Sequence, residues 1–178
     1  MHHNYIFRHC PVCGAEFQSK VVRENEPPRL VCKDESCNFI FYLDPKLVAC
    51  VIVEKDDKII LLKRAMRPER GKWVMPGGYI DRGEKVEEAA VRETREECEI
   101  DIELKDLFGV YSYPGYLEVV IVYLAEYKSG ILAAGDETTD IKLIDIEEIP
   151  WDNLAFESTR DALKDYCAFK IKIGKENL

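Results

Sequence analysis

Residues 78–100, GYIDRGEKVEEAAVRETREECEI, are the stretch of sequence that decides the fold of this chain. The fifteen residues that follow Gly83 contain neither glycine nor proline and begin with acids, which predicts a helix over about Glu84–Cys98. Plotted at about 100° per residue, the apolar side chains of this segment collect on one arc. We therefore expect the helix to pack one face against a core, directly after the glycine-rich approach Met75-Pro76-Gly77-Gly78.

Three glutamates near the end of this helix lie in an electrostatically unfavourable place. Glu93, Glu96 and Glu97 are neighbours at i, i+3 and i+4, where each like-charged pair costs about 0.2–0.5 kcal/mol. The helix dipole also favours cations at that end. Arg92 and Arg95 interleave with the acids, so a solvated charged face is one interpretation. The other is a site for a hard divalent cation such as Mg²⁺, which binds carboxylates, water and substrate phosphate.

The spacing of these residues resembles the Nudix box. Gly78 is followed after five residues by Glu84, and after seven more by RETREE at residues 92–97, with an isoleucine closing the pattern. Thr94 stands where the family has an apolar residue, and Glu99 where it has a glycine that ends the helix in a left-handed conformation. That conformation costs a glutamate about 1 kcal/mol, so this departure concerns the helix end. Every charged position of the box is present.

The resemblance implies a catalytic centre on this helix that binds Mg²⁺ or Mn²⁺. It makes Glu93 and Glu97 the principal metal ligands, with Glu96 assisting and the carbonyl of Gly77 completing the site. Arg92 is implied to support and orient this cluster.

Two further acids take their expected roles from the same resemblance. Glu84, near the helix start, is implied to share the supporting role of the arginine. In the family an acid from a later loop deprotonates water or binds a metal. Within the loop expected over residues 131–139, Glu137 is the favoured candidate, and Asp140 just beyond it is the alternative.

Four of the seven cysteines have the spacing of a zinc ribbon. Cys10 and Cys13 are separated by two residues, and Cys32 and Cys37 by four, with eighteen residues between the pairs. Four thiolates at such spacing suit a tetrahedral Zn²⁺. Disulfides in a secreted protein are the alternative, and the N-terminus has no signal-peptide h-region to favour it. The remaining three are expected to be buried structural thiols: Cys50, Cys98 and Cys167.

The chain is expected to divide into two domains. Residues 1–44 form the ribbon, in which the metal supplies most of the folding free energy, and residues 45–178 form the hydrolase domain. A length of 178 residues with 47% apolar composition allows one good core and a small appendage. The net charge of −9 argues against a nucleic-acid partner. No segment has the length of a membrane span, so we expect no membrane partner and a cytoplasmic location.

The expected elements after the ribbon alternate between strands and helices. Strands are expected over Leu47–Glu54, Lys58–Lys63, Trp73–Met75, Ile102–Val110, Leu117–Tyr127 and Ile141–Ile146, and a second amphipathic helix over about Phe156–Phe169. The order of the expected strands and helices alone indicates an α+β protein. The resemblance implies the α/β/α sandwich of the Nudix fold, and a homodimer.

Candidate substrate-binding residues lie in two loops and at the start of the strand that follows the first loop. A basic loop over residues 64–72 either contacts phosphate or is simply solvated. Three tyrosines beside a Pro-Gly turn either stack on a base or isoalloxazine ring or plug the core. The candidates are Arg64, Arg70, Trp73, Tyr111, Tyr113 and Tyr116.

The ends of the chain point to one branch of the family. The ribbon and the segment Leu154-Ala155-Phe156 resemble plant-type FAD/ADP-ribose pyrophosphatases. The NADH pyrophosphatase branch carries a Ser-Gln-Pro-Trp-Pro-Phe-Pro motif, which GVYSYPGYLEVV at residues 109–120 lacks. The resemblance implies metal-dependent hydrolysis of the pyrophosphate bond of a nucleoside diphosphate linked to another moiety, with FAD or ADP-ribose favoured. Alternatives are NADH or another dinucleotide, a nucleotide sensor that does not hydrolyse, and a ribbon that docks a partner.

Overall fold

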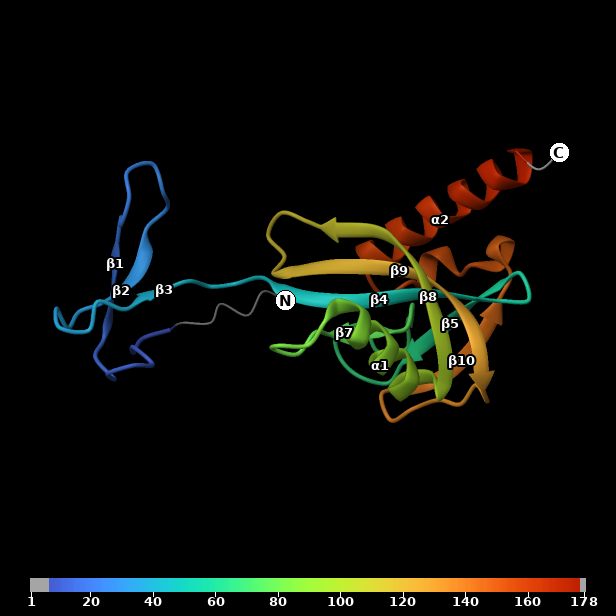
Figure 1. Cartoon of the computed structure of the whole chain (residues 1–178), viewed down its shortest axis with the longest axis horizontal. Coiled ribbons are helices and arrows are strands. Elements are labelled where there is room, and N and C mark those ends of the chain that lie inside the picture. Colours follow the sequence, from blue (N-terminus) through green and yellow to red (C-terminus); the bar gives the residue numbers. More distant parts are fainter. Residues whose placement is uncertain (1–6, 177–178) are drawn as a thin grey trace. The chain divides into compact units, whose positions relative to one another are not determined.

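The computed structural model describes residues 7–176 (Figure 1). The first six residues, with His2 and His3, and the last two lie outside the described part. The chain separates into two compact units, Met1–Pro45 and Lys46–Leu178.

The first unit is a small three-stranded sheet. Its strands are β1 (Phe17–Lys20), β2 (Arg29–Cys32) and β3 (Ile40–Phe41), paired antiparallel in that order. Its apolar packing consists mainly of phenylalanine rings, with 4.5 Å between the ring centres of Phe7 and Phe41 and 5.8 Å between those of Phe17 and Phe41. So few apolar contacts supply little stability, and folded units of this size usually need a metal or disulfides in addition.

The second unit is built on a mixed sheet. Its strands are β4 (Lys46–Lys55), β5 (Lys58–Arg64), β6 (Trp73–Val74), β7 (Gly77–Tyr79), β8 (Ile100–Ser112), β9 (Glu118–Gly130) and β10 (Thr138–Ile144). The main path is β10-β5-β4-β9-β8, while β6 joins β5 and β7 joins β4. Only the β4–β9 pair is parallel among these described strands.

Two helices cover the sheet, which confirms the expected α/β/α sandwich. They are α1 (Val86–Cys98) and α2 (Glu157–Glu176), and two 3₁₀ turns, Ile146–Glu148 and Trp151–Asn153, precede α2. Side chains of β4 alternate between the faces. Val51 and Val53 pack with Ala89 and Ala90 of α1, while Ile52 packs in the other core cluster with Leu163 of α2. Figure 1 shows the helices on opposite sides of the sheet. Within the described residues, no helix is long and apolar enough to cross a membrane.

The pairing of β4 changes along its length and opens the place where the site lies. Its first half pairs with β7, at Val48–Cys50, whereas it pairs with β5 only at Glu54 and Lys55. The backbone N–H of Val51 donates to the Pro76 carbonyl, 2.9 Å away. The glycine-rich approach therefore runs alongside β4, next to α1.

Several element boundaries differ from the expected ones. The helix α1 begins at Val86, two residues late, because Glu84 is used in a turn where it accepts the Asp81 N–H at 3.0 Å. The glycines form β7, because their bare backbone fits against β4; a methyl group at Gly77 would overlap the Ala49 carbonyl. The strand β8 includes Tyr111, which was expected in a loop. The second helix runs beyond Phe169 to Glu176.

The packing of α2 against the core predicts that alanine substitutions at a buried and at an exposed position of this helix lower the free energy of unfolding by different amounts. Leu163 is fully buried, so Leu163→Ala should lower the free energy of unfolding by about 2–5 kcal/mol through lost burial and a cavity. Ile171 is 57% exposed, and Ile171→Ala should change it by less than about 0.5 kcal/mol. Urea unfolding followed by circular dichroism measures both. Equal effects would mean that α2 does not pack as described.

Candidate active site

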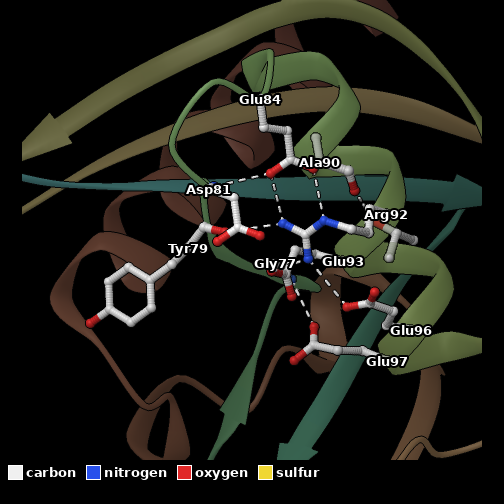
Figure 2. Close-up of polar contacts among 10 residues, drawn as sticks. Gly77, Tyr79, Asp81, Glu84, Ala90, Arg92, Glu93, Glu96 and Glu97 are labelled. Atoms are coloured by element: carbon white, nitrogen blue, oxygen red, sulfur yellow. Dashed lines mark hydrogen bonds and ion pairs between the residues drawn. The ribbon is translucent and has the colours of Figure 1, made fainter.

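Arg92 is the centre of the polar network on α1 (Figure 2). Its guanidinium donates to both carboxylate oxygens of Glu84, at 2.8 and 2.9 Å, and to Glu93 at 2.7 Å. It also donates to Glu96 at 3.2 Å and to the Tyr79 carbonyl at 3.2 Å. These partners raise the pKa of Arg92 and hold the pKa of Glu84 down at about 2. Arg92 therefore ties the start of the helix, its acidic face and β7 into one unit.

Glu97 lies outside that network. Its carboxylate accepts the backbone N–H of Gly77 at 2.8 Å, as Figure 2 shows. No lysine or arginine among residues 7–176 forms an ion pair with it. The carboxylate is thus oriented by the glycine backbone and left without a neutralising cation from the described chain.

Burial of the two inner carboxylates disfavours their charged forms. Desolvation raises the pKa of Glu97 to about 7, the Gly77 N–H offsets part of this rise, and the charges of Glu93 and Glu137 add to it. The pKa of Glu93 is also raised, first by desolvation, although Arg92 opposes the shift. Negative charge buried in this way is stabilised by a cation placed beside it.

A distant loop brings Glu137 to the same place. The last carbonyls of a helix have no partner within it. Here the Ala133 N–H donates to the Cys98 carbonyl and the Gly135 N–H to the Glu97 carbonyl, each at 3.2 Å. Capping of α1 by this loop places Glu137 close enough for its charge to raise the pKa of both inner glutamates. Asp140 instead lies in β10, in register with Lys63.

Glu99 ends the helix in the left-handed conformation. Its φ is 56° and its N–H donates to the Arg95 carbonyl at 3.0 Å. The helix thus ends as it would with the family glycine, at the expense of about 1 kcal/mol of backbone strain.

The glutamates suit a divalent cation that shares its coordination with water and substrate. Their carboxylates are desolvated and only partly neutralised, which is the condition a hard cation relieves. Their carboxylate oxygens are more widely spaced than the cysteine sulfurs. Among the described His, Cys, Asp and Glu residues, the four ribbon cysteines form the group whose ligand atoms all lie within 4.8 Å of one another. A looser carboxylate set is typical of Mg²⁺ sites completed by water and phosphate. Glu93 and Glu97 would hold the ion.

The four ribbon cysteines fit a zinc ion. All four sulfurs lie within 4.8 Å of one another. The Sγ atoms of Cys10 and Cys37 are 3.8 Å apart, and those of Cys13 and Cys32 are 3.4 Å apart. A tetrahedron with Zn–S bonds of about 2.3 Å requires sulfur separations of about 3.8 Å. The other three cysteines, Cys50, Cys98 and Cys167, are buried or partly buried thiols without disulfides.

The substrate-binding candidates Arg64, Arg70 and Trp73 lie in three different environments. Arg64, at the end of β5, lies near Glu97 and offsets part of the rise in its pKa. Arg70 is exposed. Trp73 is 6% exposed and belongs to a core cluster, so it offers a ligand little surface.

The tyrosine candidates are connected to α2. Tyr111 packs beside the core and its hydroxyl donates to Asp165 at 2.9 Å, while the Tyr113 hydroxyl donates to Asp161 at 2.8 Å. The two acids and both tyrosines line a cavity of about 350 Å³. Tyr116 is 59% exposed and lies edge-on to Tyr113.

Three features of the site were not expected from the sequence. Gly78 lies so close to the Glu93 carboxylate that a methyl group there would displace that carboxylate. Gly135 is constrained in the same way by the Glu96 carbonyl. The third is the ring of Phe156, which lies 5.0 Å from the Arg64 guanidinium. The glycines were visible as small residues in loops, but the approaching groups come from distant segments.

Two family models match this chain. The one described as NUDIX domain matches residues 44–166, and the one described as Nudix N-terminal, a zinc ribbon, matches residues 8–43. The chain therefore belongs to the Nudix family. It is a Nudix hydrolase with the N-terminal ribbon found in part of that family, and Nudix enzymes use divalent metals.

Similar proteins refine the comparison. A relative from Methanocaldococcus jannaschii, described as an ADP-ribose pyrophosphatase, is 34% identical over 89% of this chain and 95% of its own length. The crystal structure of a NUDIX hydrolase from Nitrosomonas europaea has a TM-score of 0.83, with 34% identity over 89% of both chains. The NAD-capped RNA hydrolase NudC of Vibrio atlanticus is 28% identical over 84% of this chain, which spans only 53% of that relative.

The close approach at Gly78 predicts the effect of adding one methyl group. Gly78→Ala should displace the Glu93 carboxylate and weaken Mn²⁺ binding by about 10–100-fold, the usual effect of disturbing the support of a metal ligand. Gly174→Ala is the control, because a methyl group there meets no atom within 4 Å. Paramagnetic resonance of free Mn²⁺ measures the affinity. An unchanged affinity in Gly78→Ala would show that Glu93 does not hold the metal.

The sulfur geometry predicts bound zinc. Wild-type protein should contain one Zn²⁺ per chain, and Cys10→Ser should lose most of it because one of four ligands is removed. Cys167→Ser, which alters a thiol of α2, should retain full zinc. Elemental analysis after gel filtration measures the content. Retention of full zinc by Cys10→Ser would refute the assignment.

Proposed function

We propose that this enzyme hydrolyses the pyrophosphate bond of a nucleoside diphosphate linked to a second group, with ADP-ribose or FAD as substrate. The observation that carries the proposal is the pair of buried, incompletely neutralised carboxylates, Glu93 and Glu97, beside the glycine backbone. Such a pair binds a cation, and a cation so placed attracts a diphosphate.

The bound cation supplies two things to this chemistry: it neutralises charge on the diphosphate and lowers the pKa of water. The residues of the chain do the rest by positioning. Arg92 fixes Glu93 and Glu96, and the Gly77 N–H fixes Glu97. The Gly77 carbonyl remains our proposed additional ligand.

We assign the proton transfer to Glu137. Water attacks one phosphorus atom, its proton passes to the Glu137 carboxylate, and the bond from that phosphorus to the bridging oxygen breaks. The leaving phosphate keeps the electron pair. ADP-ribose would give AMP and ribose 5-phosphate, and FAD would give AMP and riboflavin phosphate. Support for Glu137 over Asp140 comes from the effect of its charge on both inner glutamates.

The choice of substrate rests on similarity and on one missing motif. The relative described as an ADP-ribose pyrophosphatase matches along 95% of its length, which favours ADP-ribose. The Leu154-Ala155-Phe156 segment supports the FAD/ADP-ribose branch. Relatives described as NAD-capped RNA hydrolases favour a dinucleotide as the second candidate, although residues 109–120 lack the NADH motif. Arg64, Arg70 and the tyrosines 111, 113 and 116 are the proposed substrate contacts.

A substrate panel tests the proposal. ADP-ribose, FAD, NADH, dinucleoside polyphosphates and nucleoside triphosphates are each incubated with Mg²⁺, with Mn²⁺ and with chelator, and products are separated by chromatography. We expect metal-dependent release of AMP from ADP-ribose or FAD. Preferred cleavage of NADH would replace the substrate assignment with the dinucleotide alternative. Tight binding of a nucleotide without hydrolysis would identify a sensor and refute the proposal.

Removal of one inner carboxylate should abolish most of the activity. Glu97→Gln is expected to lower kcat by at least about 100-fold, since even disturbing the outer support of a metal site costs about 10–100-fold. The variant should fold normally, because Gln fills the same volume. Glu88→Gln, on the exposed side of α1, is the matched control and should keep wild-type kcat. Unchanged turnover in Glu97→Gln would contradict the site.

Assembly and location complete the proposal. We infer a homodimer from the family resemblance, and sedimentation velocity would test it. We also infer a reducing compartment such as the cytoplasm, because the four clustered cysteines suit zinc only as thiolates.

A further inference from the structure

The segment Leu154-Ala155-Phe156, which directly precedes α2, contributes one side chain near the active site. Leu154 forms a parallel bridge with Trp73, and the Ala155 N–H donates to the Trp73 carbonyl at 2.8 Å. Trp73 in turn lies in register with Lys63 of β5. The next residue along, Phe156, is thereby placed beside the end of β5.

The backbone of Phe156 is fixed at both ends. Leu154 and Ala155 before it are 4% and 8% exposed, and its own carbonyl accepts the Arg160 N–H at 3.1 Å, at the first turn of α2. The ring is partly buried against the core cluster that includes Ala89 and Ala90. The ring is therefore held against the core with part of its surface open.

Arg64 lies over that surface. Its guanidinium carbon is 5.0 Å from the ring centre of Phe156, and its Nε–H donates to the Pro68 carbonyl at 3.1 Å. The backbone of Arg64 is bonded to Lys72 and Gly71 at 3.0 and 2.8 Å. One face and one edge of the guanidinium are thus occupied by uncharged groups.

The remaining nitrogens of Arg64 are available to a ligand. Within residues 7–176, Nη1 and Nη2 have no hydrogen-bond acceptor and the side chain forms no ion pair. The neighbouring residue, Ala65, donates its N–H to the Glu137 carbonyl at 2.8 Å, which ties this end of β5 to the catalytic loop. A planar guanidinium held in this way presents two parallel N–H groups to a phosphate.

We propose that Phe156 is a positioning residue: its ring holds the Arg64 guanidinium in the orientation in which Nη1 and Nη2 bind a phosphate of the substrate. The inference rests on the proposed function, because it requires a diphosphate at this site. The proposal gives the Leu154-Ala155-Phe156 segment a physical role. This segment, which is distant from Arg64 in the sequence, places an aromatic ring beside the guanidinium.

The first test compares rings with non-aromatic side chains. Phe156→Leu, with Phe156→Met as a second variant of similar volume, should raise KM for ADP-ribose or FAD by about 5- to 30-fold, the range for losing a partly desolvated cation–π contact. The value of kcat should change less than twofold. Phe156→Tyr keeps the ring and should keep wild-type KM. Tyr127→Leu, which removes the ring 3.7 Å from Lys55, is the control and should also leave KM unchanged.

The second test asks whether Phe156 acts through Arg64. In an Arg64→Ala background, adding Phe156→Leu should raise KM no further, because the group that the ring positions is gone. An equal increase in both backgrounds would overturn the proposal and give Phe156 a merely structural role. An unchanged KM in folded Phe156→Leu and Phe156→Met would overturn it as well. Thermal unfolding and zinc content verify the fold of each variant.

A binding measurement separates this proposal from the proposed function. Titration calorimetry with the α,β-methylene analogue of ADP-ribose, which cannot be hydrolysed at the bridge, measures affinity in the presence of Mg²⁺. Weaker binding by Phe156→Leu but not Phe156→Tyr supports the positioning role even if the wild type hydrolyses nothing. Hydrolysis by the wild type with equal affinities in all variants would leave the proposed function intact and refute the role of Phe156. An absence of binding to the wild type would refute both.

Discussion

The candidate active site depends on negatively charged carboxylates that are buried near the C-terminal end of α1. The helix dipole, the neighbouring carboxylates and desolvation all oppose the charge of Glu97. Within residues 7–176, the Gly77 N–H donates a hydrogen bond to it and the charge of Arg64 also favours it. Arg92 pairs with Glu84, Glu93 and Glu96 but forms no ion pair with Glu97. A charge placed in this way is stabilised by a proton or by a cation beside it, and the metal site that we propose uses the second of these.

The rest of the domain supplies the stability that this arrangement needs. Two apolar clusters, one on each face of the sheet, surround side chains such as Ile52 and Val51 that are almost fully buried. Because β4 exchanges β5 for β7 along its length, the glycine backbone can lie against β4 and still meet α1. The ribbon is a contrast, since its few phenylalanine contacts make it dependent on four sulfur ligands.

The start of α2 and the loop before β10 connect distant parts of the chain to the glutamates. The loop caps α1 through Ala133 and Gly135 and thereby places Glu137. The segment before α2 follows β6 and thereby places Phe156 against Arg64. In both cases backbone hydrogen bonds set the position of the single side chain to which we assign a role.

The sequence by itself determined the family and the fold class, and it predicted a two-part organisation and the acids of a metal site. Helical period, glycine positions and cysteine spacing are local properties, and they identified α1, its glutamates and the ribbon sulfurs, with helix and strand ends in error by a few residues. The tertiary structure alone decided that Arg92 pairs with Glu93 and not with Glu97, that Gly78 lies against the Glu93 carboxylate, and that Phe156 meets Arg64. It also decided that Tyr111 lies in a strand and that Trp73 is buried. These facts depend on contacts between segments that are tens of residues apart, and the free energy of such a contact is set by burial and distance, which no local pattern records.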